Sequence, residues 1–174
     1  MKKINLLVIL LSAVLLSACE EDTKEYVHIG PNWASLHALQ PSEKTFKVDI
    51  KADASAILGG KLVFKVKSEQ AGKLWILQVD PKDQVSLIYP NAMATEHKIA
   101  SDSWLSIPAD GATWSVEAME PVGASVLVFI VTTANADLKT VFNGQTQEMD
   151  KALRIVENSA AWGLAKQVIE INKE

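Results

Sequence analysis

The sequence predicts a mainly β protein: an antiparallel β-sandwich of about seven or eight strands, with a pair of helices near the C-terminal end. Two observations support this expectation. Short apolar runs are separated by turn signals such as Asp80-Pro81-Lys82-Asp83 through the middle of the chain, as in antiparallel sandwiches. Beyond about residue 135 the apolar residues recur with the period of a helix.

The first two strands are expected where apolar and charged residues alternate. Residues 46–51 place Phe46, Val48 and Ile50 on one face, and residues 61–67 place lysines at the polar positions. Because successive side chains of a strand point to opposite faces, this alternation indicates half-buried strands. The second strand should therefore carry a basic outer face.

The centre of the sheet is expected where the apolar runs are continuous. Residues 74–79 are almost continuously apolar and residues 126–131 are apolar at every position, which is typical of strands covered on both faces. Residues 85–89 should pair with the first run as a hairpin. Further strands are expected over residues 104–107, 113–118 and 125–132.

The expected helices lie in the last third of the chain. Asn135 can cap a short helix that ends at Asn143-Gly144, and an amphipathic stripe predicts a longer helix from about Gln147 to Ala161. Gly163 should end this second helix. The β-branched residues around Val168 favour one last strand.

The N-terminal segment has the features of a bacterial lipoprotein signal. Two lysines, an apolar run over residues 6–16 and the small pair Ser17-Ala18 precede Cys19, the only cysteine in the chain. The segment is too short for a stable membrane span. It resembles the lipobox, which implies cleavage before Cys19 and attachment of a diacylglycerol and an N-acyl chain to that residue; no other cofactor is expected. A simple secretory signal is the alternative.

The expected domain organisation follows from this signal. Residues 1–18 form the lipoprotein signal peptide, residues 19–40 a lipidated tether and irregular segment, and residues 41–174 a single β-rich domain. Similar lipoproteins with Asp after the cysteine are usually retained at the inner membrane, whereas this chain has Glu20. By that resemblance we expect a lipid-anchored protein on the periplasmic face of the outer membrane.

The charge of the chain argues against nucleic acid as a partner. The full sequence has a formal net charge of −4, and removal of a signal peptide with two lysines makes the balance more acidic. Nucleic-acid binding depends on basic residues that neutralise phosphates. We therefore expect no nucleic acid, contact with the membrane through the lipid anchor, and an envelope protein as partner.

Four stretches in the middle of the chain form a pattern: Gly60–Val66, Leu74–Asp80, Val85–Asn91 and Ile107-Pro108. Together they resemble the bacterial domain of unknown function 4384. The resemblance covers about Leu58 to Val131, and Trp75 stands where the family usually has Tyr or Phe. It implies an envelope or multidomain β module of unassigned activity, and it supplies no catalytic residues.

The corner Tyr89-Pro90-Asn91 has two interpretations. Pro90 lacks an N–H and ends a strand, and the Asn91 side chain can hold the following turn, so the corner can be purely structural. Ordered loops on a sandwich are also where recognition usually occurs. On the second interpretation Tyr89, Pro90 and Asn91 form a partner-binding loop.

No residue pattern predicts catalysis or a metal site. Glu96, His97 and Asp102 form the one group that resembles acid–base or metal chemistry, but their spacing matches no ligand motif. Adjacent residues on an extended chain point to opposite faces. A surface loop is therefore the favoured interpretation, and we expect no enzyme activity.

Two classes of function remain open. The favoured one is a non-catalytic protein-interaction or structural module of the cell envelope, with a secretion-system accessory as its narrower form. The alternative is a protein that binds or processes a small ligand or cell-wall glycan in a concave aromatic or carboxylate-lined pocket. Five tryptophans could line such a groove, but each lies in an apolar strand or at a helix end, so core filling is favoured. They are Trp33, Trp75, Trp104, Trp114 and Trp162.

Overall fold

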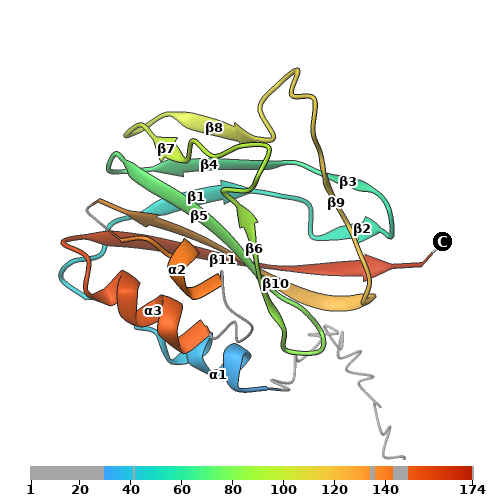
Figure 1. Cartoon of the computed structure of the whole chain (residues 1–174), viewed down its shortest axis with the longest axis horizontal. Helices are drawn as coiled ribbons and strands as arrows, with labels where there is room; N and C mark the ends of the chain where they lie inside the picture. Colours follow the sequence, from blue (N-terminus) through green and yellow to red (C-terminus); the bar gives the residue numbers. More distant parts are fainter. Residues whose placement is uncertain (1–29, 41, 134–135, 143–148, 174) are drawn as a thin grey trace, which may run out of the picture.

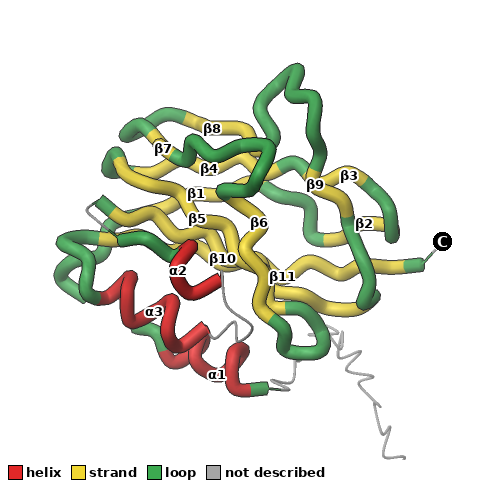
Figure 2. Tube along the Cα trace, in the orientation of Figure 1, coloured by secondary structure: helices red, strands yellow, loops and turns green. Residues whose placement is uncertain are grey.

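Among the residues that the structure describes, the strands form three sheets whose pairings are mostly antiparallel (Figures 1 and 2). The computed structural model describes residues 30–40, 42–133, 136–142 and 149–173. Within these ranges the elements are α1 (Pro31–Ala38), β1 (Val48–Lys51), β2 (Ser55–Ile57), β3 (Lys61–Leu62), β4 (Phe64–Ser68), β5 (Gly72–Val79), β6 (Val85–Tyr89), β7 (Lys98–Ile99), β8 (Trp104–Ile107), β9 (Val116–Glu117), β10 (Gly123–Thr132), α2 (Lys139–Phe142), α3 (Met149–Glu157) and β11 (Trp162–Asn172). A mainly β protein is confirmed, although the described residues hold eleven strands instead of seven or eight.

The largest sheet has its most apolar strand at its centre. Its main strands lie in the order β2-β11-β10-β5-β6, and β7 pairs with the start of β5. β10 pairs antiparallel with β11 from Gly123, opposite Ile171, to Thr132, opposite Trp162, and it pairs with β5 on its other side. Both continuous apolar runs therefore lie in the middle of the sheet, as expected, and they also pair with each other.

The strands of alternating residues form a smaller sheet, in the order β1-β4-β8. Its inward side chains meet one face of the large sheet in a shared core that includes Phe64, Val66 and Phe129. The rings of Phe64 and Phe129 lie 5.5 Å apart in an edge-to-face arrangement. Lys65 is exposed on the outer side of β4 and Lys67 is partly exposed there, so the basic outer face predicted for this strand is present.

Two short strands lie where longer ones were expected. The run over 61–67 is divided at Val63, which is 50% exposed, because β3 leaves the small sheet and pairs with β9 instead. β9 itself covers only Val116–Glu117 of the expected 113–118. The alternating residues 61–67 therefore form two strands, β3 and β4, that belong to different sheets.

Helices cover the other face of the large sheet, below it in Figure 1. Trp33 and Leu36 of α1 and Val156 of α3 join Trp75 and Leu77 of β5 in a second core. No clear helical pair is formed near the C-terminal end, since α2 has only four residues and α3 packs beside α1 instead. The expected caps at Asn135 and Asn143-Gly144 and the start of the longer helix at Gln147 lie outside the described residues.

α1 is held by a turn that lies about fifty residues further along the chain. The Asp83 carboxylate accepts hydrogen bonds from the backbone N–H groups of Asn32 and Trp33, both at 2.9 Å, and so caps the start of α1. A Cβ at Gly30 would lie 2.1 Å from Asp83 Cγ. Asn32 also accepts a bond from the Met149 N–H at 2.9 Å, so one residue joins α1 to α3.

Gly163 is part of β11 and does not end α3, which finishes at Glu157. A Cβ at Gly163 would lie 2.6 Å from Val48 Cγ2 and 2.7 Å from the Phe46 carbonyl oxygen. The chain before β1 runs parallel to the start of β11 at this point, where the Phe46 N–H donates to the Trp162 carbonyl oxygen at 3.0 Å. A glycine is required there by close backbone approach, a non-local cause that the local sequence does not reveal.

Candidate interaction site

The corner Tyr89-Pro90-Asn91 follows β6 and is anchored by its first two residues. Tyr89 and Pro90 are both buried, and the peptide bond between them is cis. The Tyr89 hydroxyl donates a hydrogen bond to the Glu96 carbonyl oxygen. Burial raises the pKa of the Tyr89 hydroxyl above its usual 10.0, and the Glu96 carboxylate adds to this shift. The hydroxyl therefore stays protonated and remains a donor through the neutral pH range.

Asn91 holds the turn after the corner. Its Nδ2 donates to the Ile88 carbonyl oxygen at 3.1 Å, and its Oδ1 accepts from the N–H groups of Met93 and Ala94 at 3.0 and 2.9 Å. The side chain thus fills the turn-holding role that the sequence predicts for it. Met93, at the tip of this turn, is 68% exposed.

A hollow of about 240 Å³ opens beside Asn91. Its floor consists of apolar side chains from β6, β10 and β11, and its outer wall is the segment from Ser115 to Met119, which contains β9. The floor residues are Ile88, Leu127, Ile169 and Ile171. The hollow can therefore receive an apolar group at the end of the molecule where β9 crosses the large sheet.

The wall of this hollow is fixed by backbone hydrogen bonds. The Ala118 N–H donates to the Gly60 carbonyl oxygen at 2.9 Å, and the Ala118 carbonyl oxygen accepts from Gly59 at 2.8 Å. Ala118 is consequently buried, whereas its neighbour Met119 is 72% exposed at the rim. Nothing in the sequence pointed to Met93 or Met119, because single methionines in loops form no pattern.

The group of Glu96, His97 and Asp102 does not form a metal site. His97 Nδ1 lies 3.0 Å from the Thr95 carbonyl oxygen, and its ring packs against Trp75 with 4.5 Å between centroids. Asp102 lies in the turn before β8, where its backbone N–H donates to Ser68. In the described part of the chain, no three His, Cys, Asp or Glu residues are arranged to hold a metal ion.

The five tryptophans divide between core and surface. Trp33, Trp75 and Trp162 are buried, and Trp114 is partly buried. Trp104 differs, being 42% exposed on the outer side of β8. The expectation of core filling is therefore wrong for Trp104, because its side chain lies on the outer face of β8.

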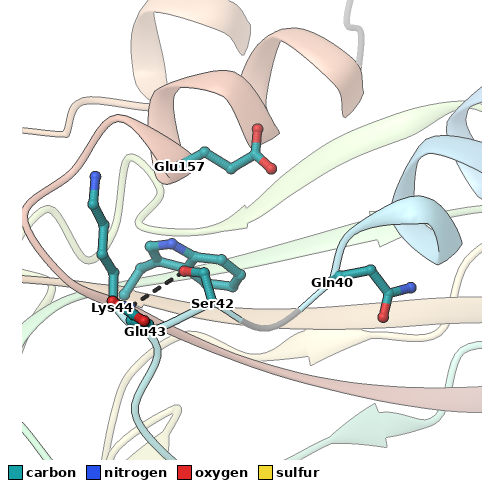
Figure 3. Close-up of a pocket in the computed structure, with 6 residues that line it drawn as sticks. Gln40, Ser42, Glu43, Lys44 and Glu157 are labelled. Atoms are coloured by element: carbon teal, nitrogen blue, oxygen red, sulfur yellow. Dashed lines mark hydrogen bonds between the residues drawn. The ribbon is translucent and has the colours of Figure 1, made fainter.

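A second hollow, of about 390 Å³, lies between α3 and the chain that follows α1 (Figure 3). It is lined by Gln40, Ser42, Glu43, Lys44, Glu157 and Trp162. Figure 3 shows Glu157 extending from α3 on one side and the segment of Ser42 to Lys44 on the other. Two carboxylates and one ammonium group therefore line this hollow together with the buried Trp162.

Comparison with known families places a domain of unknown function, DUF4384, at residues 57–135. This agrees closely with the resemblance found over Leu58 to Val131. The matched span contains β5, β6 and β10, whereas β11, which completes the middle of the large sheet, lies beyond it. A search of curated proteins finds no match. Among the described helices, none has the length and apolar character needed to cross a membrane.

Proposed function

We propose that this protein is a lipid-anchored module of the cell envelope, facing the periplasm from the outer membrane, that binds another envelope protein without catalysis. The observation that carries the proposal is the hollow beside Asn91, with the exposed Met119 side chain at its rim. Methionine is flexible and polarisable, and it is common at surfaces that bind proteins. An accessory role in a secretion system is the narrower form of this proposal.

The fixed backbone around the hollow favours recognition. The Asn91 turn and the Ala118 wall are already held by their own hydrogen bonds, so a partner would not have to order them. Less conformational entropy is lost when a binding surface is preorganised. The apolar floor supplies the contact area, and polar residues that also line the hollow, among them Gln78, Ser86 and Ser115, can orient a partner.

The anchor is proposed from the sequence motif that ends at Cys19, which lies outside the described residues. Replacing the thiol by a hydroxyl in Cys19→Ser removes the acylation site. We expect the variant to lose lipid labelling and to leave the membrane fraction. If the variant still pelleted with outer membranes after a high-salt wash, lipid would not be the anchor.

The interaction is tested by pull-down from detergent-solubilised envelopes. Met119→Glu places a charge at the rim of the hollow and should abolish capture of the partner. Val63→Glu is the matched control, because Val63 is also an exposed apolar residue but does not line the hollow. Circular dichroism melts of both variants establish that they are folded. Capture that persists in folded Met119→Glu would contradict the proposal.

The second candidate function is binding or processing of a small ligand or cell-wall glycan. The hollow in Figure 3 favours it, because Glu43, Lys44 and Glu157 together could hold a polar ligand. Calorimetric titration with soluble peptidoglycan fragments tests this alternative. Binding that disappears in the double variant Glu43→Gln with Glu157→Gln, but persists in Met119→Glu, would favour it over the interaction proposal.

A further inference from the structure

The outer face of the small sheet is basic, although the whole chain is acidic with a formal charge of −4. Strand alternation places one set of side chains of β1, β4 and β8 away from the core. This set contains Asp49, Lys51, Lys65, Lys67 and Trp104, and the exposed Lys47 just before β1 joins it through its ion pair with Asp49. We call these residues the basic face.

Two lysines of the basic face converge on Trp104. The Lys51 Nζ lies 4.6 Å from the centroid of the Trp104 ring and the Lys67 Nζ lies 5.7 Å from it. Lys51 belongs to β1, two strands away from β8, so its side chain reaches across the sheet. The negative face of the indole attracts both ammonium groups and so concentrates positive charge beside β8.

This positive charge is only partly neutralised. Asp49 lies 2.9 Å from Lys47 and 3.7 Å from Lys67. Lys51 and Lys65 form no ion pair with any carboxylate of the described ranges. The charge next to Trp104 is therefore complementary to an anionic partner.

β8 also offers an open backbone edge. It is the end strand of its sheet and pairs with β4 alone among the described strands. The outer N–H and C=O groups of an end strand can pair with an added strand. A peptide beside β8 would gain both these hydrogen bonds and the ammonium groups near Trp104, whereas a polysaccharide or a lipid headgroup has no peptide backbone to pair along the edge.

We propose that the β8 edge and the basic face bind an extended acidic segment of a partner protein by strand addition. Alternate residues of such a segment would lie on the same side as Trp104, and their carboxylates would meet Lys51 and Lys67. This surface is separate from the hollow beside Asn91, so the two sites can be tested independently.

The test uses the purified full chain in detergent and a fluorescent octapeptide of alternating Glu and Thr. We expect the peptide to bind at low salt, and the double variant Lys51→Ala with Lys67→Ala to weaken binding about tenfold. Trp104→Ala should weaken it as well, and Trp104→Phe should restore part of the loss. Lys82→Ala, which removes an exposed lysine outside the basic face, should leave binding unchanged.

Hydrogen exchange separates strand addition from simple charge attraction. The peptide should slow exchange of the amides in Trp104–Ile107, and a peptide of alternating Gln and Thr should not. Polygalacturonate and anionic phospholipid vesicles serve as competing anions without peptide bonds. Preferential binding of either one, or peptide binding that leaves exchange in β8 unchanged, would overturn the proposal.

Discussion

The two larger sheets differ in how many of their faces are covered. β10 of the large sheet is buried along its length from Ser125 to Thr132, with one core on each face. β4 of the small sheet alternates between buried residues and the exposed or partly exposed Lys65 and Lys67. A strand covered on both faces can carry little but apolar residues. In a strand covered on one face, the residues that point to solvent can be polar or charged. We infer that stability resides mainly in the first sheet, whereas the outward positions of the second tolerate charged side chains.

The sharpest way to test this comparison is Phe129→Ala. Phe129 is fully buried in β10 and packs against Phe64 of the small sheet, so its loss should lower the free energy of unfolding by about 3 to 5 kcal/mol. The matched change is Lys65→Ala on the exposed face of β4. It should alter the free energy of unfolding by no more than about 0.5 kcal/mol. Urea unfolding curves measure both. Similar costs for the two variants would break the distinction between the sheets.

A smaller effect tests whether the helical layer depends on the large sheet. Asp83→Gly removes the carboxylate that caps α1 while keeping a positive φ that glycine accepts, and it should cost about 1 to 2 kcal/mol. Asp102→Gly is the control, because Asp102 also has a positive φ but lies in the small-sheet region. The midpoint of thermal unfolding should fall further for Asp83→Gly than for Asp102→Gly. Equal midpoints would show that the cap contributes nothing.

The smallest effect concerns the edge strand β6 and appears as a dependence on pH. Tyr89→Phe removes the hydrogen bond to the Glu96 carbonyl and should cost about 1 kcal/mol at neutral pH. Because the folded pKa of Tyr89 is raised above 10.0, its contribution is fully present below pH 10 and is lost as the pH rises through the folded pKa. The variant should therefore lose less stability than wild type above pH 10. Parallel alkaline slopes in denaturant unfolding would contradict this assignment.

Sequence patterns predicted those parts of the fold whose cause is local. The alternation at residues 46–51 and the apolar run at 126–131 each reflect how the strand itself is covered, and both positions were correct. The division at Val63 could not be predicted, because it depends on β9, which lies about fifty residues away. The need for glycine at position 163 could not be predicted either, because it arises from the close approach of the Phe46 backbone. Nor could the cap of α1, because it is supplied by Asp83.

The candidate sites were predictable to a lesser degree. The turn-holding role of Asn91 follows from the chemistry of asparagine after a proline corner, and the structure contains its hydrogen bonds. The hollow beside it requires β9 to cross the large sheet, which no local pattern encodes. Lysine alternation predicted a basic face, but the approach of Lys51 to Trp104 joins strands that are distant in sequence.

The bonds around Asn32 have a mechanical consequence. Asn32 binds Asp83 through its backbone N–H, the Asp83 carbonyl through Nδ2, and the Met149 N–H through Oδ1. A pulling force on the chain ahead of Pro31 would therefore be shared at once between the β5–β6 turn and α3. The load would spread over the two elements that flank α1 before any strand of the large sheet was peeled from its neighbour.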